Sequence, residues 1–399
     1  MNVADLPPAD VSRQEYVARA KELQPALRER ADAASRGRRL PEETIADLQR
    51  AGLFRVLQPA RFGGVEGHPM TFFEVQATLA EACPSTAWVY GVIGVHAWQL
   101  ALFDDRAQQE VWGDDPTTLI SSSYMPVGKL TPAEGGWRLS GRWSFSSGSD
   151  HCQWIFLGGF CPTGPDAKGP DMRTFLLPRA DYSIEDVWHT SGLRATGSND
   201  IVVDDVFIPE HRTHKLIDGF FCKSPGNSVN PGPLYKIPFG QLFVRSVSGT
   251  AIGLAQGALD VYLAAGRDRV GQADGAKVAF EVTAQEVAAK AAATIDEVKL
   301  VLARNMDALM GWAETGEQMP LHRRIAFRMD SSRTVERCVE AVDGLFTASG
   351  GRAIFEGHPL NRYWQDIHAA RAHFANNPAT PARNFGGMLL GLKNTDFFL

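Results

Sequence analysis

The sequence predicts an α+β protein with an N-terminal helical domain (residues 1–117), a central antiparallel β domain (residues 118–225) and a C-terminal four-helix bundle (residues 226–399). Three observations support this division. Apolar residues recur at helical spacing early in the chain, short strand-like segments begin after Pro116, and Ala- and Leu-rich helical periodicity runs from Phe239 onwards. A chain of 399 residues also exceeds the usual size of a single hydrophobic core.

The composition limits the possible functions. A net charge of -6 and the absence of a dense basic run argue against nucleic-acid binding. No run of about 20 apolar residues occurs, and the N-terminus has no signal-peptide pattern, so we expect a cytoplasmic protein that does not span a membrane. The five cysteines are scattered without zinc-ligand spacing, so we expect reduced thiols and no metal site.

The N-terminal domain is expected to contain four helices, over residues 16–34, 41–51, 69–83 and 84–103. The last of them is apolar on almost every side, which predicts a buried helix. Within it, Trp88 and His96 are eight residues apart and therefore lie close to one face. His96 must satisfy its ring nitrogens there, either as a core histidine bonded to a backbone carbonyl or as part of a site.

Seven short segments separated by Gly, Pro and Asp turns predict the β domain: residues 118–124, 137–139, 143–147, 154–159, 173–177, 182–188 and 201–208. In the third segment, alternation places Trp143, Phe145 and Ser147 on one face and Ser144 and Ser146 on the other. An aromatic ring beside hydroxyl groups at a strand end is a suitable seat for a planar cofactor. An edge strand with two buried aromatics would have the same pattern.

A loop between two of these strands, GLRATGS at residues 192–198, supplies hydroxyl groups among glycines. Such a loop can bind a phosphate or the edge of a ring through its backbone N–H groups and hydroxyls. A plain hairpin loop would have the same composition.

The C-terminal part is expected to form four helices, over residues 240–267, 276–312, 320–348 and 360–375. The irregular segment before them, residues 211–238, is expected to be a lid or a pocket wall. Asp366 and His373 are seven residues apart and share a helix face, so an Asp-oriented histidine could act as a general base. A surface network of Asp, Arg and His would give the same spacing.

Motifs for several other chemistries are missing from the sequence. It contains no GxSxG elbow, no GxGxxG after a strand and no phosphate-binding P-loop. A flavin held between the β domain and the helices is the remaining option for a large cofactor.

Three segments resemble signature motifs of the acyl-CoA dehydrogenase superfamily: LSGRWSFSSG, GLRATGSNDIVVDDVFIP and PARFGG. The chain is more similar still to the flavin-dependent monooxygenase branch of that superfamily, the oxygenase components of two-component aromatic hydroxylases. STAWVYGVIGVHAWQLALF and RYWQDIHAARAHFANNP carry this closer resemblance. Where short-chain acyl-CoA dehydrogenases have their catalytic glutamate, this chain reads AHFANN, so the usual base for a thioester substrate is missing.

The resemblance implies a role for each candidate catalytic residue. Ser147 would lie beside flavin N5 and donate a hydrogen bond to it, His96 would hold the phenolic oxygen of the substrate, and Ser122 would be a hydroxyl near both. His373 would assist proton transfer next to the substrate ring, and Asp366 would align it.

The resemblance also implies further flavin contacts: Trp88, Phe145 and Ser146 within the chain, Ser349 and Gly350 across a subunit interface, and Arg269 at the flavin phosphate. The implied protein is a homotetrameric oxygenase component that receives reduced flavin (FMNH2 or FADH2) from a separate NAD(P)H:flavin reductase. Reaction with O2 would form a flavin C4a-hydroperoxide that hydroxylates a small aromatic substrate of the phenol class. The missing nicotinamide fingerprint agrees with a separate reductase.

Three alternatives stay open at this point. The first is an oxygenase of the same fold that acts on an indole or an amine nitrogen. The second is an acyl-CoA dehydrogenase, and the third is a helical interaction protein without enzymatic activity.

Overall fold

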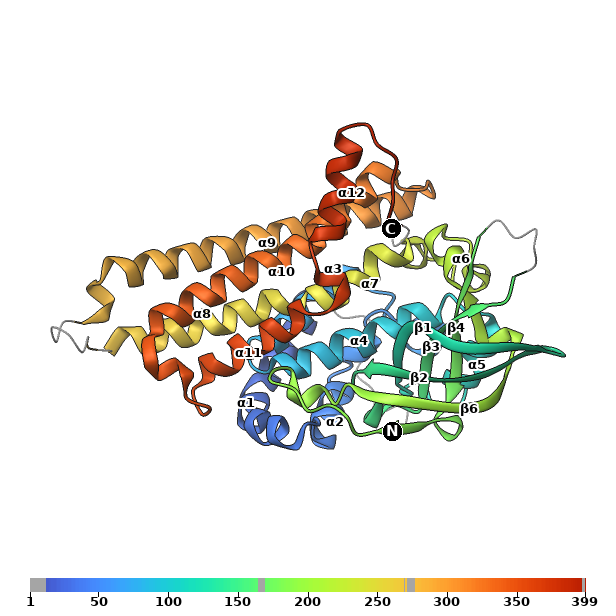
Figure 1. Ribbon diagram of the computed structural model, residues 1–399, viewed down its shortest axis with the longest axis horizontal. Helices are drawn as coiled ribbons and strands as arrows, with labels where there is room; N and C mark the ends of the chain where they lie inside the picture. Colours follow the sequence, from blue (N-terminus) through green and yellow to red (C-terminus); the bar gives the residue numbers. More distant parts are fainter. Residues whose placement is uncertain (1–11, 164–168, 269, 271–276, 397–398) are drawn as a thin grey trace.

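The computed structural model describes residues 12–163, 169–268, 270, 277–396 and 399. The elements follow the predicted order of helices, strands and helices, and the predicted fold class is confirmed (Figure 1). In the ranges just given, none of the helices has the length and apolar character needed to cross a bilayer.

The N-terminal helices are α1 (Arg13–Gly37), α2 (Glu42–Arg50), α3 (Pro69–Ala80), α4 (Pro84–Leu100) and α5 (Asp105–Trp112). The first four match predicted helices. α5 was not predicted because it is short. Its N-cap residue, Asp104, accepts a hydrogen bond from the Arg106 N–H. α4 starts at a proline, which fits the first turn of a helix, and it is buried along nearly its whole length.

The strands are β1 (Ile120–Ala133), β2 (Gly136–Ser146), β3 (Trp154–Cys161), β4 (Asp171–Pro178), β5 (Ser183–Glu185), β6 (Asn199–Pro209) and β7 (Thr213–Lys215). They form one sheet in the order β5-β6-β2-β1-β3-β4-β7. The prediction of a purely antiparallel domain was wrong at one position, because β1 and β3 pair in parallel from Ile120 to Ser123. The long strand β1 changes partner along its length and pairs with β2 in antiparallel fashion from Lys129 onwards.

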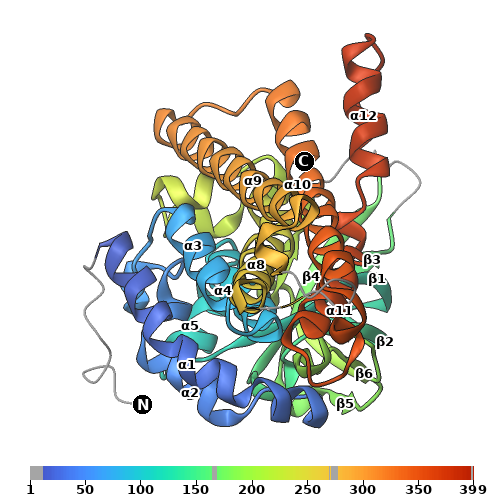
Figure 2. The ribbon, with the colours of Figure 1, turned by 90° about the vertical axis from the view of Figure 1, so that its left-hand side faces the viewer.

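The C-terminal helices are α6 (Leu216–Phe220), α7 (Phe239–Ser248), α8 (Thr250–Asp268), α9 (Val282–Thr315), α10 (Leu321–Ser349), α11 (Pro359–Arg371) and α12 (Ala379–Leu389). Helices α8 to α11 pack against one another as the bundle, and α12 projects from the body of the molecule (Figure 2).

The helix predicted over residues 240–267 is interrupted between α7 and α8. The buried amide of Gln76 on α3 donates to the carbonyl oxygen of Ser246 at 2.6 Å and to Thr250 Oγ1 at 2.9 Å. A side chain that inserts into the backbone ladder in this way is a common cause of a break in a helix. The break could not be read from periodicity, because Gln76 is more than 160 residues away in sequence.

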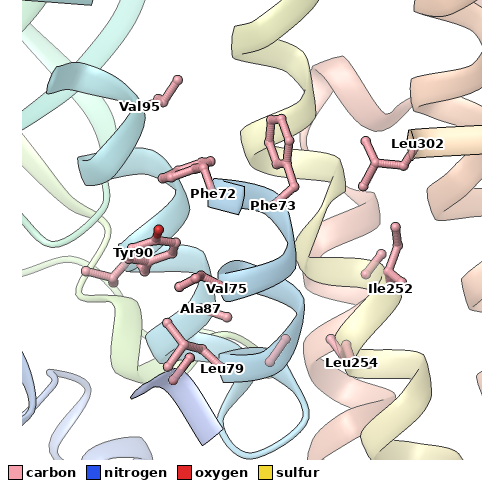
Figure 3. Close-up of a cluster of buried hydrophobic side chains, with 14 of the residues drawn as sticks. Phe72, Phe73, Val75, Leu79, Ala87, Tyr90, Val95, Ile252, Leu254 and Leu302 are labelled. Atoms are coloured by element: carbon pink, nitrogen blue, oxygen red, sulfur yellow. The ribbon is translucent and has the colours of Figure 1, made fainter. Parts of the chain in front are cut away.

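The main hydrophobic core joins α3 and α4 to the bundle (Figure 3). Phe72 on α3 stacks on Tyr90 of α4 with ring centroids 4.9 Å apart, whereas Phe73 points to the other side of α3, towards the bundle helix α8. Burial of each large side chain contributes about 1.5–3 kcal/mol. α4 is therefore fixed between the sheet and the bundle, and it carries Trp88 and His96 into this position.

Candidate active site

The end of β2 has an irregular backbone. Phe145 has a φ of 68°, in a region that non-glycine residues rarely adopt, and its side chain is 64% exposed. The pairing of β2 with β6 shifts between Trp143 and Ser146, so the alternation of the strand is broken there. The prediction that Trp143, Phe145 and Ser147 share one face was therefore wrong: Trp143 is buried in the sheet core, and Phe145 points out beside Trp188. Strain of this kind is concentrated at functional sites.

The Trp88 indole links Ser147 and His373. Trp88 Nε1 donates to Ser147 Oγ at 3.1 Å, and the ring centroids of Trp88 and His373 are 5.8 Å apart at 66°. Ser147 comes from the end of β2, Trp88 from α4 and His373 from the turn after α11. Three parts of the chain that are far apart in sequence therefore meet at this site.

Ser147 Oγ also contacts a second hydroxyl, Ser198 Oγ, at 2.7 Å. Ser198 Oγ in turn lies 2.7 Å from Thr196 Oγ1, which donates to the Leu193 carbonyl at 2.8 Å. Thr196 and Ser198 belong to the GLRATGS loop, and the only sequence signal for their role was the presence of hydroxyls among glycines. Nothing in the sequence indicated that they bond to Ser147.

His96 lies two helical turns beyond Trp88 on α4, about 12 Å along the axis. Its Nδ1 donates to the carbonyl oxygen of Ile120 at 2.6 Å, because a carbonyl can only accept. Its Nε2 is then a buried acceptor without a partner among the described residues. Burial lowers the pKa of His96 to about 4, so the imidazole is neutral near pH 7. An orphaned buried acceptor of this kind points to a ligand hydroxyl or N–H.

Ser122 and Tyr124 lie on β1 near His96. The Tyr124 ring meets the His96 ring edge-on, with centroids 6.2 Å apart, and the Tyr124 hydroxyl donates to Gln99 Oε1. Burial raises the pKa of Tyr124, and interactions with Ser122 and Gln99 partly oppose this shift. Ser122 is thus close to Tyr124 and to the end of the site that contains His96.

His373 is half-buried and accepts a hydrogen bond at Nδ1 from the backbone N–H of Ala375 at 3.2 Å. The neutral ring therefore carries its proton on Nε2. Desolvation, with a smaller effect of the Arg328 guanidinium, lowers the pKa of His373 to about 4. His96 and His373 thus differ: His96 offers an acceptor at Nε2, and His373 offers a donor at Nε2.

The structure places Asp366 elsewhere than predicted. Asp366 Oδ1 accepts a hydrogen bond from the Leu193 backbone N–H at 2.5 Å, and in the described part of the chain no hydrogen bond joins Asp366 to His373. Although the two residues are two turns apart, α11 ends at Arg371, so His373 has left the helix face that Asp366 occupies. Burial raises the pKa of Asp366 to about 7, against the opposing effect of the Leu193 N–H.

The remaining predicted flavin contacts are divided between several locations. Ser146 is buried next to Ser147, and its Oγ has no partner among the described residues. Ser349 and Gly350 lie at the C-terminal end of α10, where the Ser349 hydroxyl donates to the Leu345 carbonyl, and this turn contacts α10 and α11 rather than β2. Arg269 lies outside the described residues.

Comparison with known proteins supports one family over almost the whole chain. Residues 15–115 match the acyl-CoA dehydrogenase N-terminal domain, and residues 246–378 match the acyl-CoA dehydrogenase C-terminal domain. The chain is 40% identical to the flavin-dependent monooxygenase oxygenase subunit HsaA of Mycobacterium tuberculosis (strain ATCC 25618 / H37Rv), over 96% of this chain and 97% of that protein.

Two further similarities agree with this assignment. The chain is 33% identical to the oxygenase component of the FADH2-dependent resorcinol hydroxylase of Rhizobium sp. (strain MTP-10005), over 92% of each chain. The crystal structure of the 3-HSA hydroxylase from Rhodococcus sp. RHA1 matches with a TM-score of 0.92 at 39% identity, over 96% of this chain and 99% of that chain. The protein therefore belongs to the acyl-CoA dehydrogenase superfamily and, within it, to the flavin-dependent monooxygenases of the oxygenase-subunit type.

Proposed function

We propose that this protein is the oxygenase component of a two-component monooxygenase, which uses reduced flavin and O2 to hydroxylate a phenol next to its hydroxyl group. The observation that carries the proposal is the buried acceptor Nε2 of the neutral His96, which has no partner among the described residues and lies on the same helix as Trp88, the contact of Ser147 and His373. The relatives that are named as oxygenase subunits support a separate reductase as the source of reduced flavin.

The residues around Ser147 fit a flavin. The hydroxyls of Ser146 and Ser147 and the Trp88 ring form a buried surface at the end of β2, and Ser146 Oγ has no partner among the described residues. A flat heterocycle with several ring nitrogens and carbonyl groups needs this combination of a stacking ring and hydrogen-bonding hydroxyls. When bound, reduced flavin supplies the two electrons that let one atom of O2 enter the substrate ring while the other leaves as water.

His96 would bind the hydroxyl of the phenol at Nε2. A histidine with a pKa of about 4 is a poor base for a phenol, whose pKa is about 10. Complete proton transfer before the reaction would therefore be unfavourable. Instead, the hydrogen bond orients the substrate and becomes stronger as the ring gives up electron density, which favours attack from the carbon next to the hydroxyl.

His373 would act on the oxygen that is transferred, whereas His96 acts on the phenol. Its Nε2–H can donate to the oxygen atom that gains negative charge during the transfer. Because its pKa is low, the ring carries no charge at rest, and a proton held on it as an imidazolium would be given up readily. Ser122 and Tyr124 would complete the wall of the site near His96.

The assembly is proposed to be a homotetramer. Three leucines on or just after the projecting helix α12 are strongly exposed: Leu389 at 72%, Leu390 at 84% and Leu392 at 65%. Such a cluster on a protruding element is typical of an interface between chains. A second chain would also be needed to bring Ser349 and Gly350 to the flavin. Light scattering after size-exclusion chromatography tests the number of chains.

Oxygen transfer to a phenol is the direct test of the function. The protein is mixed without air with chemically reduced FMN or FADH2, and ¹⁸O2 is then added with a panel of phenols, indoles and acyl-CoA thioesters. We expect a phenol product that gains one ¹⁸O atom beside its hydroxyl group. Products only from indoles, or bleaching of oxidised flavin by an acyl-CoA without oxygen, would rule out the proposal.

A further inference from the structure

A chain of hydroxyl groups extends from the candidate flavin site into the protein. It consists of Ser147, Ser198 and Thr196, with oxygen–oxygen distances of 2.7 Å at both contacts. The Trp88 indole N–H binds the outer end at 3.1 Å, and the Leu193 carbonyl binds the inner end at 2.8 Å. All three hydroxyl side chains are buried, with at most 8% of the residue exposed. We call this chain the hydroxyl relay.

The two ends of the hydroxyl relay favour one arrangement of its hydrogens. Each hydroxyl has one hydrogen, the Trp88 indole can only donate, and the Leu193 carbonyl can only accept. In the arrangement that keeps the hydrogen bonds at both ends, Thr196 gives its hydrogen to Leu193, Ser198 gives its hydrogen to Thr196, and Ser147 gives its hydrogen to Ser198.

In this arrangement Ser147 has already donated its only hydrogen. One of its lone pairs binds the Trp88 N–H, and the other remains available to a ligand. Towards the flavin, Ser147 is then an acceptor. This direction is the opposite of the donation from Ser147 to flavin N5 that the resemblance to the family implies.

The hydroxyl relay can also run in the opposite direction, at a cost. The Leu193 carbonyl accepts from Trp188 Nε1 at 2.9 Å and from the Thr196 backbone N–H at 3.2 Å, so it stays satisfied when the Thr196 hydroxyl turns away. Thr196 would then donate to Ser198, Ser198 to Ser147, and Ser147 to the ligand. This reversal gives up the 2.8 Å hydrogen bond from Thr196 to Leu193.

The loop that carries the hydroxyl relay is held firmly. Leu193 has a φ of 48°, which is unfavourable for a leucine, and its N–H is bound by Asp366. The Thr196 carbonyl accepts from the Gly148 N–H at 2.8 Å, next to Ser147. The distances between the hydroxyls are therefore set by contacts to both α11 and the turn after β2.

We propose that Thr196 and Ser198 are positioning residues that keep Ser147 a hydrogen-bond acceptor and so make the site prefer reduced flavin over oxidised flavin. Reduced flavin carries a hydrogen on N5, which suits an acceptor, whereas N5 of oxidised flavin has a lone pair and needs a donor. Oxidised flavin could bind Ser147 only after the hydroxyl relay has reversed. The inference rests on the proposed function, because it requires a flavin at Ser147.

The test compares dissociation constants for oxidised and reduced FMN, the latter measured without oxygen, so that no turnover is involved. In Thr196→Val, Ser198 has lost its acceptor and turns its hydrogen to Ser147, which then donates to the ligand. We expect the ratio of the oxidised to the reduced dissociation constant to fall by roughly five- to tenfold, the value of about one hydrogen bond. Thr196→Ser keeps a hydroxyl and should retain the wild-type ratio.

Two further variants complete the experiment. Ser198→Ala frees the hydrogen of Ser147 by a different route and should lower the same ratio, which covers the case that Thr196→Val does not fold. Thr334→Val is the matched control, because Thr334 is equally buried and donates to the Asp330 carbonyl at 2.9 Å within α10. An unchanged ratio in folded Thr196→Val and Ser198→Ala would overturn the hydroxyl relay, whereas a wild-type protein that binds neither form of flavin would overturn the proposed function instead.

Discussion

At the scale of single residues, the site depends on which ring nitrogen of each histidine is already in use. His96 Nδ1–H donates to the Ile120 carbonyl oxygen, and His373 Nδ1 accepts from the Ala375 N–H. The backbone thereby sets the free nitrogen of one ring as an acceptor and that of the other as a donor. Substitution of His96 and substitution of His373 should therefore affect different steps of the reaction.

His96→Ala should weaken the binding of a phenol without changing the affinity for reduced flavin. Loss of the acceptor for a buried hydroxyl costs about 1–3 kcal/mol, so the dissociation constant should rise roughly 5- to 150-fold. Wild-type protein should bind the phenol more tightly than its methyl ether, and this difference should disappear in His96→Ala. Equal binding of phenol and ether by the wild type would contradict the role of His96.

His373→Ala should leave phenol and flavin binding intact but uncouple the reaction. Without the Nε2–H donor, reducing equivalents should appear as hydrogen peroxide in place of hydroxylated product. The measurement is the ratio of peroxide to product per flavin oxidised. An unchanged ratio would show that His373 does not take part in the transfer.

At the scale of elements, the site depends on the close approach of the turn after β2 to α4. Gly148, with a φ of 70°, begins this turn, and a Cβ there would lie 2.8 Å from Ile93 Cδ1 and 2.9 Å from Val89 Cγ1. Glycine is therefore required both by the backbone conformation and by the lack of space. The turn thereby keeps Ser147 Oγ within hydrogen-bonding distance of Trp88 Nε1, at 3.1 Å.

Gly148→Ala should destabilise the protein by about 1–3 kcal/mol and weaken the binding of reduced flavin, because the turn must move away from α4. Gly135→Ala is the matched control, since Gly135 has a φ of 76° but no atom within 4 Å of the added Cβ. It should show only the backbone strain, about 1–2 kcal/mol. Urea unfolding and anaerobic flavin titration of both variants separate the two effects.

At the scale of the whole molecule, buried ionisable groups link stability to pH. Burial lowers the pKa of His96, of His214 and of His373 to about 4, from the ordinary value of 6.5. Their contribution to the free energy of unfolding is fully present above pH 6.5 and is lost as the pH falls towards 4. Asp366 acts in the opposite sense, because burial raises its pKa from 3.8 to about 7, and its contribution is lost as the pH rises towards 7.

Between pH 4 and 6.5 the three histidines oppose one aspartate, so the free energy of unfolding should fall on acidification. Asp366→Asn removes the opposing group and should steepen this fall by about 1.4 kcal/mol per pH unit. Urea unfolding at pH 5, 6 and 7 measures both slopes, with the exposed Asp32→Asn as the control. Equal slopes for wild type and Asp366→Asn would be incompatible with a buried, protonated Asp366.

From the amino-acid sequence alone we could predict the order of helices and strands, the buried helix that carries Trp88 and His96, and the hydroxyl-rich strand end. These features follow from local periodicity, because a repeat of apolar residues specifies which face of an element is buried. The resemblance to a family added the flavin contacts and the roles of the two histidines.

The hydrogen-bond and strand partners, in contrast, become visible only in the folded protein. The broken alternation at Phe145, the bond from Asp366 to Leu193 instead of to His373, and the parallel pair β1 and β3 all arise between segments that are distant in sequence. The direction of the hydroxyl relay depends on a donor on α4 and an acceptor in the loop before β6. Periodicity specifies burial but not hydrogen-bond partners, which exist only once these segments are packed together.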